Sequence, residues 1–176
     1  MRKVLYILGQ LTDQDTDWLA VVGKRLHVKS GELLVRQGEH LEQLFIVLDG
    51  ELKVLAAQGQ EIARVGVGDI LGEMSFVDDS PTSASVQTVS EVLVLAVEHR
   101  LISQRMAADA AFAARFYKSI AIFLADRMRN VLSRFGYGES PGDLDEMQLG
   151  ELDGHVLDTL HLAGSRFDRM LKKLIG

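Results

Sequence analysis

Residues 29–97 consist of short apolar runs separated by glycine-containing breaks at intervals of about ten residues. Strands of this length, bounded by turn residues at even spacing, are typical of all-β sandwiches and barrels. The breaks also supply the tolerance of positive φ that tight hairpins need. This spacing predicts a β-rich domain and constrains the fold more than any other feature. The breaks are Ser30-Gly31, Gly38-Glu39, Asp49-Gly50, Gln58-Gly59, Gly66 and Gly68-Asp69.

Two runs in this region lack the alternation of a half-exposed strand. Leu44–Leu48 reads LFIVL and Leu93–Val97 reads LVLAV, so both are apolar at every position. A strand with this pattern is buried on both of its faces. We therefore expect both strands to be buried on both sides.

The segment before the β-region is predicted to be helical over residues 1–28. Thr12 and Asp15 have the spacing of a capping box. The apolar residues expected on one helical face are Trp18, Leu19, Val22 and Leu26. We expect this face to pack on the core.

Residues 98–135 are predicted to hold a hinge and a long helix. The segment 109–135 contains no Gly or Pro, and its apolar residues recur at steps of three and four. Such a stripe suits either a coiled-coil seam between two copies or packing on the chain's own β-domain. The homodimer is the favoured interpretation. The seam residues expected for it are Phe116, Ile120, Phe123 and Met128.

Residues 136–176 are predicted to form a linker and an acidic helical tail. Gly136, Gly138, Pro141 and Gly142 indicate the linker. Docking of the tail on the partner helix and docking on the β-domain both remain open. The basic cluster Arg166–Lys173 is interpreted as a solvated helix face.

Composition limits the classes of function. The chain has 176 residues, 47% of them apolar, a formal net charge of −6 and no cysteine. This charge disfavours nucleic acid and anionic lipid as partners, and disulfides and thiolate metal sites are excluded. No stretch has the length of a membrane-spanning helix or of a signal-peptide core. We therefore expect a cytoplasmic protein without membrane contact.

The β-region as a whole resembles the cyclic-nucleotide-binding domain family. The resemblance is carried by GELLVRQGEHLEQLFIVLDGELKV (residues 31–54), GQEIARVGVGDILGEMSF (residues 59–76) and PTSASV (residues 81–86). It implies a mainly β fold, a jelly-roll type β-roll at 29–97 with flanking helices and a long C-terminal helix. It also implies a regulatory or sensor module like those of kinase regulatory subunits, gated channels and bacterial activators. The ligand implied is cAMP or cGMP.

The resemblance also implies which residues hold the ligand. Gly72 lets the backbone approach a cyclic phosphate, and the carboxylate of Glu73 accepts from the ribose 2′-hydroxyl. Backbone N–H groups at a helix start suit the anion chemically. The remaining residues implied are Met74, Ser75, Thr82, Ser83, Ala84 and Ser85 on the cassette, and Arg127, Asn130 and Val131 on a lid helix that swings from a hinge near residues 95–101.

Thr82 departs from the family pattern. It occupies the position at which ligand-binding members carry an arginine for the phosphate, and Asp78 and Asp79 precede it. A charge-assisted arginine contact contributes about 1.5–3 kcal/mol, so its loss weakens binding by roughly 10- to 150-fold. Three hypotheses follow. In the first, a weak nucleotide site takes its cation from Arg64, Arg127 or Arg129. In the second, the site holds a different ligand. In the third, the chain is a ligand-free interaction module with a vestigial pocket.

Other functions find little support in the sequence. The family's activators continue into a basic DNA-binding domain, whereas residues 139–176 carry more acidic than basic side chains. We therefore expect no direct DNA binding and a separate effector protein. His155 and His161 are six residues apart on the expected tail helix, so we predict no metal site. No Walker-type or dinucleotide-type glycine loop occurs, and we predict neither catalysis nor a cofactor.

Overall fold

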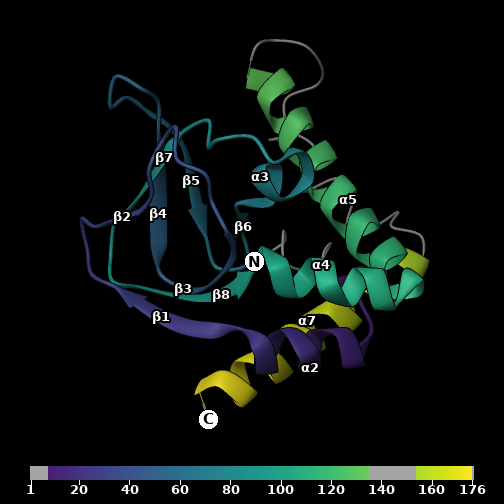
Figure 1. Cartoon of the computed structure of the whole chain (residues 1–176). Coiled ribbons are helices and arrows are strands. Elements are labelled where there is room, and N and C mark those ends of the chain that lie inside the picture. Colours follow the sequence, from purple (N-terminus) through teal and green to yellow (C-terminus); the bar gives the residue numbers. More distant parts are fainter. Residues whose placement is uncertain (1–7, 135–153, 176) are drawn as a thin grey trace.

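The computed structural model describes residues 8–134 and 154–175. Within these residues, eight strands form two four-stranded antiparallel sheets, so the β-rich region that the glycine spacing predicted is confirmed (Figure 1). The first sheet has the order β1-β8-β3-β6 and the second the order β2-β7-β4-β5. The strands are β1 (Lys24–Val28), β2 (Leu33–Val35), β3 (Gln43–Asp49), β4 (Glu51–Leu55), β5 (Glu61–Gly66), β6 (Ile70–Leu71), β7 (Ser85–Thr88) and β8 (Val92–Glu98).

Helices flank this β-roll on one side. The helices are α2 (Asp13–Val22), α3 (Glu73–Asp78), α4 (His99–Ala108), α5 (Ala110–Arg134) and α7 (Gly154–Ile175). Figure 1 shows α5 running past α3 along the side of the roll, with α2 and α7 together near the base of α5. The predicted β-roll with a long C-terminal helix is confirmed.

Strands β3 and β8 separate two apolar cores. Along β3, Phe45 and Val47 face the interior of the roll, whereas Leu44 and Ile46 face the helices. Strand β8 alternates in the same way, since Val94 lies in the roll core and its neighbours on either side lie in the helical core. Both runs are buried on both faces, as their uniform apolar character predicted.

The capping box at the start of α2 is present. The Asp15 N–H donates to Thr12 Oγ1 at 3.2 Å, and the Thr12 N–H donates to Asp15 Oδ2 at 2.8 Å. The predicted helix over residues 1–28 is wrong beyond residue 22. The chain turns at Gly23, whose backbone is extended, and Lys24–Val28 pair with β8 as an edge strand. Leu26 therefore belongs to a sheet and not to the helical face predicted for it.

The apolar stripe of α5 packs within the chain. Phe116, Ile120 and Phe123 are each 2% exposed and lie in the helical core, whereas Met128 is 59% exposed. The predicted dimer seam is therefore wrong at these three buried positions, because a periodic stripe buries equally well against its own domain. The helix begins after a break at Asp109, whose carboxylate accepts the Phe112 N–H at 2.9 Å.

The C-terminal helix α7 docks on α2. The predicted linker at residues 136–142 lies outside the described residues. The interpretation of the basic cluster Arg166–Lys173 as a solvated helix face holds for Arg169, Lys172 and Lys173, which are exposed. It is wrong for Arg166, which is only 15% exposed. Arg166, Arg169 and Lys173 form ion pairs with Asp13 and Asp17. In the described part of the chain, no helix is long and apolar enough to cross a membrane.

Candidate functional site

Gly72 sets the course of the backbone at the candidate site. It lies between β6 and α3 with φ of +87°, the left-handed region that glycine tolerates best. A Cβ at this position would lie 2.6 Å from the Gln43 carbonyl oxygen and 2.7 Å from the Leu41 side chain. Only glycine therefore allows the turn that brings α3 against β3.

A cavity of about 100 Å³ lies between this turn, the loop before β7 and helix α5. Its lining includes the predicted Gly72, Glu73, Met74, Ser75, Thr82, Ser83 and Ala84, together with Arg127. Among the predicted residues, Ser85 and Val131 are not in the lining, and the Asn130 side chain lies outside the described part. The Ser85 hydroxyl instead accepts the Gln37 N–H at 3.0 Å. The structure thus brings seven of the eight predicted cassette residues to one cavity.

The floor of the cavity comes from residues that the motif comparison missed. They are apolar side chains of the adjoining strands and loop: Val35, Leu41, Val54, Leu71 and Val86. Four of them belong to the core of the roll. The period-two alternation of β2, β4 and β7 would have identified the inward-facing strand residues.

Glu73 and Arg127 form an ion pair inside the cavity. Arg127 Nη1 donates to Glu73 Oε1, and the Arg127 guanidinium also lies 5.3 Å from the centre of the Phe123 ring. Glu73 is only 2% exposed. Burial raises the pKa of the Glu73 carboxyl above its ordinary value, although the positive charge of Arg127 acts in the opposite direction. The pair therefore joins the cassette to α5.

Thr82 is held by its own loop. Its hydroxyl donates to the Arg36 carbonyl, its N–H donates to the Glu39 carbonyl at 3.0 Å, and its carbonyl accepts the Gly38 N–H at 2.8 Å. The hydroxyl that the sequence offered as a ligand contact is thus engaged by the backbone of the turn after β2.

The charges around the cavity distinguish the three candidate cations. Arg127 lines the cavity, whereas Arg64 forms ion pairs with Glu51 and Glu61 on the β4–β5 hairpin. Arg129 is exposed and is absent from the lining. Asp78 is in the lining and accepts the Ser80 N–H at 3.0 Å. Two carboxylates and one guanidinium therefore border the cavity among the described residues.

Comparison with known sequences identifies the same region. The family model of the cyclic nucleotide-binding domain matches residues 25–109, from β1 to just past α4. An uncharacterised protein of Mycobacterium tuberculosis (strain H37Rv) is 32% identical over 88 residues, which are 50% of this chain and 17% of that protein. The cGMP-dependent protein kinase egl-4 of Caenorhabditis briggsae is 26% identical over 102 residues, 56% of this chain and 14% of the kinase. The chain thus spans less than a fifth of either relative's length.

Comparison with solved structures supports the fold. A cyclic nucleotide-binding domain from Methylobacillus flagellatus superposes with a TM-score of 0.69 at 23% identity, covering 75% of this chain and 80% of that one. The shared architecture is the β-roll with its flanking helices. The sequence match thus covers most of the β-roll of this chain, and the superposition shows that the two chains share a fold.

Proposed function

We propose that this chain is a non-enzymatic regulatory module that binds cAMP or cGMP weakly, with Arg127 replacing the cation that Thr82 does not supply. The observation that carries the proposal is the position of Arg127, which reaches from α5 into the cassette cavity and pairs with Glu73. The match to the cyclic nucleotide-binding domain family and to a cGMP-dependent kinase supports this class of ligand.

Arg127 has the chemistry that the site requires. A guanidinium presents five N–H donors in a planar fork, so it can hold one carboxylate and still donate to an anion. In the ligand-bound state, the cyclic phosphate would take donors from Arg127 and from the cassette backbone. The ribose 2′-hydroxyl would donate to Glu73. The ligand would then contact both Glu73 of the cassette and Arg127 of α5, the two residues that form the ion pair.

The size of the cavity favours a switch. Small-molecule pockets usually enclose about 300–1,000 Å³, whereas this cavity is about 100 Å³. We therefore expect the Arg127 side chain or α5 to move when a nucleotide enters. Because a ligand shifts an equilibrium through its different affinities for two states, entry would favour a displaced α5. That displacement would be the signal to a separate effector protein.

The runner-up function is a ligand-free dimerisation or protein-interaction module with a vestigial pocket. Thr82 is bound to its own loop, Asp78 borders the cavity, and Glu73 already has a partner. These three observations favour a cassette that no longer takes an anion. The intact turn at Gly72 favours the sensor.

The homodimer remains part of the proposal, with a revised seam. Tyr117, Met128 and Val131 are exposed on α5 at the spacing of a heptad, and Leu124 between them is partly buried. This exposed stripe replaces the buried residues first expected to meet a partner. A second copy packed along this stripe would place the α5 helices of the two copies side by side.

The decisive experiment is thermal unfolding of the full chain titrated with cAMP, cGMP and a cyclic dinucleotide. A nucleotide at 100 times its dissociation constant adds about 2.7 kcal/mol to the free energy of unfolding, which corresponds to roughly 5–10 °C for this size. We expect a saturable shift with cAMP or cGMP. The same titration on Thr82→Arg should give about 10- to 150-fold tighter binding, because the charge-assisted contact is restored.

The matched variant for the lid is Arg127→Met, which keeps the length of the side chain and removes its charge. We expect this variant to lose the nucleotide shift. Stronger binding in Arg127→Met would show that Arg127 blocks the site instead of supplying its cation. No shift in the wild type at millimolar nucleotide, with a shift in Thr82→Arg, would overturn the sensor and favour the interaction module.

A further inference from the structure

Helix α7 packs on the N-terminal segment through apolar side chains. Ala163, Met170 and Leu174 of α7 are buried, and they belong to the same core cluster as Leu8 and Leu11. Helix α2 is the element with which α7 makes its main contact in the described chain. The seat of α7 is thus separate from the cassette cavity, whose described lining contains no residue of α7.

Charged side chains border this contact. Arg166 pairs with Asp13 at 2.7 Å, Arg169 pairs with Asp13 at 3.3 Å and with Asp17 at 2.7 Å, and Lys173 pairs with Asp17 at 2.8 Å. Asp13 and Asp17 are four residues apart and so lie on one face of α2. Their carboxylates match a row of cations at steps of three and four on the facing helix.

Arg166 adds a specific contact to the charge match. Its Nη1 donates to the carbonyls of Leu8 and Gly9 at 3.0 and 3.3 Å. Residues 8–10 are helical, and the helix is interrupted before α2. Carbonyls at a helix end lack intrahelical partners, and a cation placed there is favourable. Arg166 therefore recognises the break between the two helical pieces.

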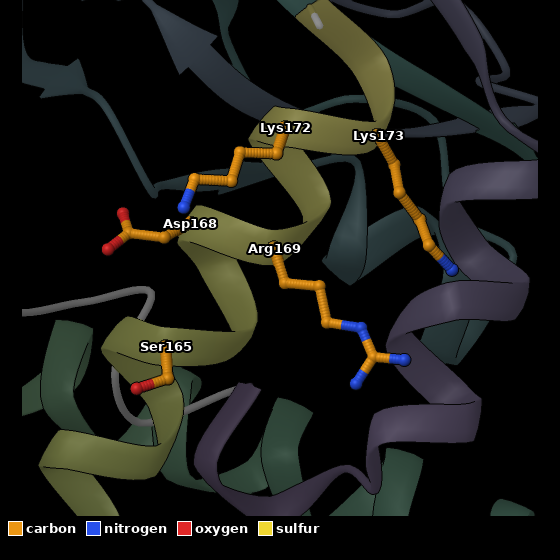
Figure 2. Close-up of a pocket in the computed structure, with 5 residues that line it drawn as sticks. All are labelled: Ser165, Asp168, Arg169, Lys172 and Lys173. Carbon is orange, nitrogen blue, oxygen red and sulfur yellow. The ribbon is translucent and has the colours of Figure 1, made fainter.

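Charged side chains of α7 extend to two different sides of the helix. In Figure 2, Arg169 and Lys173 extend toward the neighbouring N-terminal helix, whereas Asp168 and Lys172 lie on the other side of α7. These residues and Ser165 line a shallow hollow beside the helix. The recognition pattern is thus basic at 166, 169 and 173 and apolar at 163, 170 and 174.

We propose that residues 8–22 form a docking face for a basic amphipathic helix of a partner protein, and that α7 occupies this face as an internal competitor. The docking face is acidic at Asp13 and Asp17 and apolar at Leu8 and Leu11. A helix that docks in a groove uses apolar anchors at steps of three, four and seven residues, as α7 does at 163, 170 and 174. The carboxylates of Asp13 and Asp17 select a partner helix that is basic.

Helix α7 belongs to the same chain as the docking face, so it competes with a partner as an attached helix. An attached helix competes at an effective concentration in the millimolar range. A partner helix therefore binds well only when α7 is released.

The test uses a fluorescent synthetic peptide of residues 154–175 as the basic helix, added to the full chain and followed by anisotropy. Arg166→Glu, Arg169→Glu and Lys173→Glu together release the internal competitor. We expect the peptide to bind this triple variant at least tenfold more tightly than the wild type, and to bind less tightly as salt is raised from 50 to 300 mM. Adding Asp13→Lys and Asp17→Lys to the triple variant should abolish binding.

The matched control is Lys172→Glu, which changes the same charge on the other side of α7 and should leave peptide binding as in the wild type. If the triple variant does not unfold cooperatively, the double variant Arg169→Glu with Lys173→Glu replaces it, because this variant keeps the Arg166 contacts. Its peptide affinity is then compared with that of the wild type. Equal binding to wild type and released variant, or binding to neither, would overturn the proposal. A wild-type dimer that these reversals abolish would assign the docking face to α7 of a second copy and would also overturn it.

Discussion

His99 lies at the junction between the cassette and the hinge. It is the first residue of α4, and its ring packs edge-on against Phe76 of α3 with 5.1 Å between the ring centroids. Its buried Nε2 has no hydrogen-bond partner in the described part of the chain. Burial lowers the pKa of His99 below its ordinary value of 6.5, although Asp79, Glu42 and a hydrogen bond to the backbone of Gln43 act in the opposite direction.

This pKa shift predicts a loss of stability in mild acid. Below pH 6.5 the unfolded state takes up a proton that the folded state resists, so the free energy of unfolding falls as the pH decreases through that range. Urea unfolding at pH 7.5 and 5.5 measures the effect. We expect His99→Gln to lose less stability than the wild type between these pH values. His27→Gln, which changes an exposed histidine, is the control, and equal losses in all three proteins would contradict the assignment to His99.

Single residues also show what the sequence could and could not reveal about the site. The Gly72-Glu73 pair and the loop residues Thr82–Ala84 could be placed at one site from the resemblance to the family's cassette, which lies within one short stretch of the chain. The partner of Glu73 could not, because Arg127 is 54 residues away and its orientation depends on how α5 packs. Ser85 was misplaced because a one-residue shift on a strand moves a side chain to the other face.

At the scale of elements, Asp15 joins three helices. It is 1% exposed, accepts from Thr12 within α2, and pairs with Arg105 of α4 and Arg115 of α5, each at 2.8 Å. Burial acts to raise the pKa of Asp15, but hydrogen bonds from Arg115 and Thr12 outweigh it and hold the pKa below its ordinary value. The Arg105 guanidinium also lies 4.6 Å from the centre of the Trp18 ring. Both sides of the break at Asp109 are thus tied to α2.

Asp15→Asn should therefore destabilise the helical side of the molecule. The substitution removes the carboxylate that two arginines share, and loss of a hydrogen-bonded charged partner at a buried position costs about 2–3 kcal/mol. Chemical denaturation at pH 7 measures this cost. Asp13→Asn is the control, since Asp13 lies in exposed ion pairs worth less than about 1 kcal/mol each. A similar small loss in both variants would show that Asp15 does not join the helices.

The boundaries and contacts of the helices were predictable from the sequence to different degrees. The capping box at Thr12 marked the start of α2 correctly because both of its hydrogen bonds are local. The end of α2 was missed because Leu26 continues the helical period, although Gly23 breaks the helix and β8 supplies a strand partner. The docking of α7 on α2 could not be predicted, since Arg166 and Asp13 are 153 residues apart.

At the scale of the whole molecule, α5 carries two apolar faces. One face holds Phe116 and Phe123 in the helical core, and the other leaves Tyr117, Met128 and Val131 exposed. The sequence alone could not assign these faces, because both recur at steps of three and four. An all-β region was predictable in contrast from the turn spacing and the doubly apolar strands, and the family resemblance specified the β-roll.

The exposed face of α5 predicts a dimer that a single charge should disrupt. We expect light scattering to give a dimer for the wild type at about 100 µM, and Met128→Lys to shift it toward monomer by at least tenfold in dissociation constant, because a buried lysine at a seam loses hydration that nothing replaces. Val21→Lys is the matched control, since Val21 is an exposed apolar side chain on another helix, α2, with an exposure of 78%. It should leave the mass unchanged. The prediction is contradicted if the wild type is a monomer at this concentration, or if its dimer is unaffected by Met128→Lys. The exposed face of α5 would then not form a dimer interface, and α5 would act within a single copy.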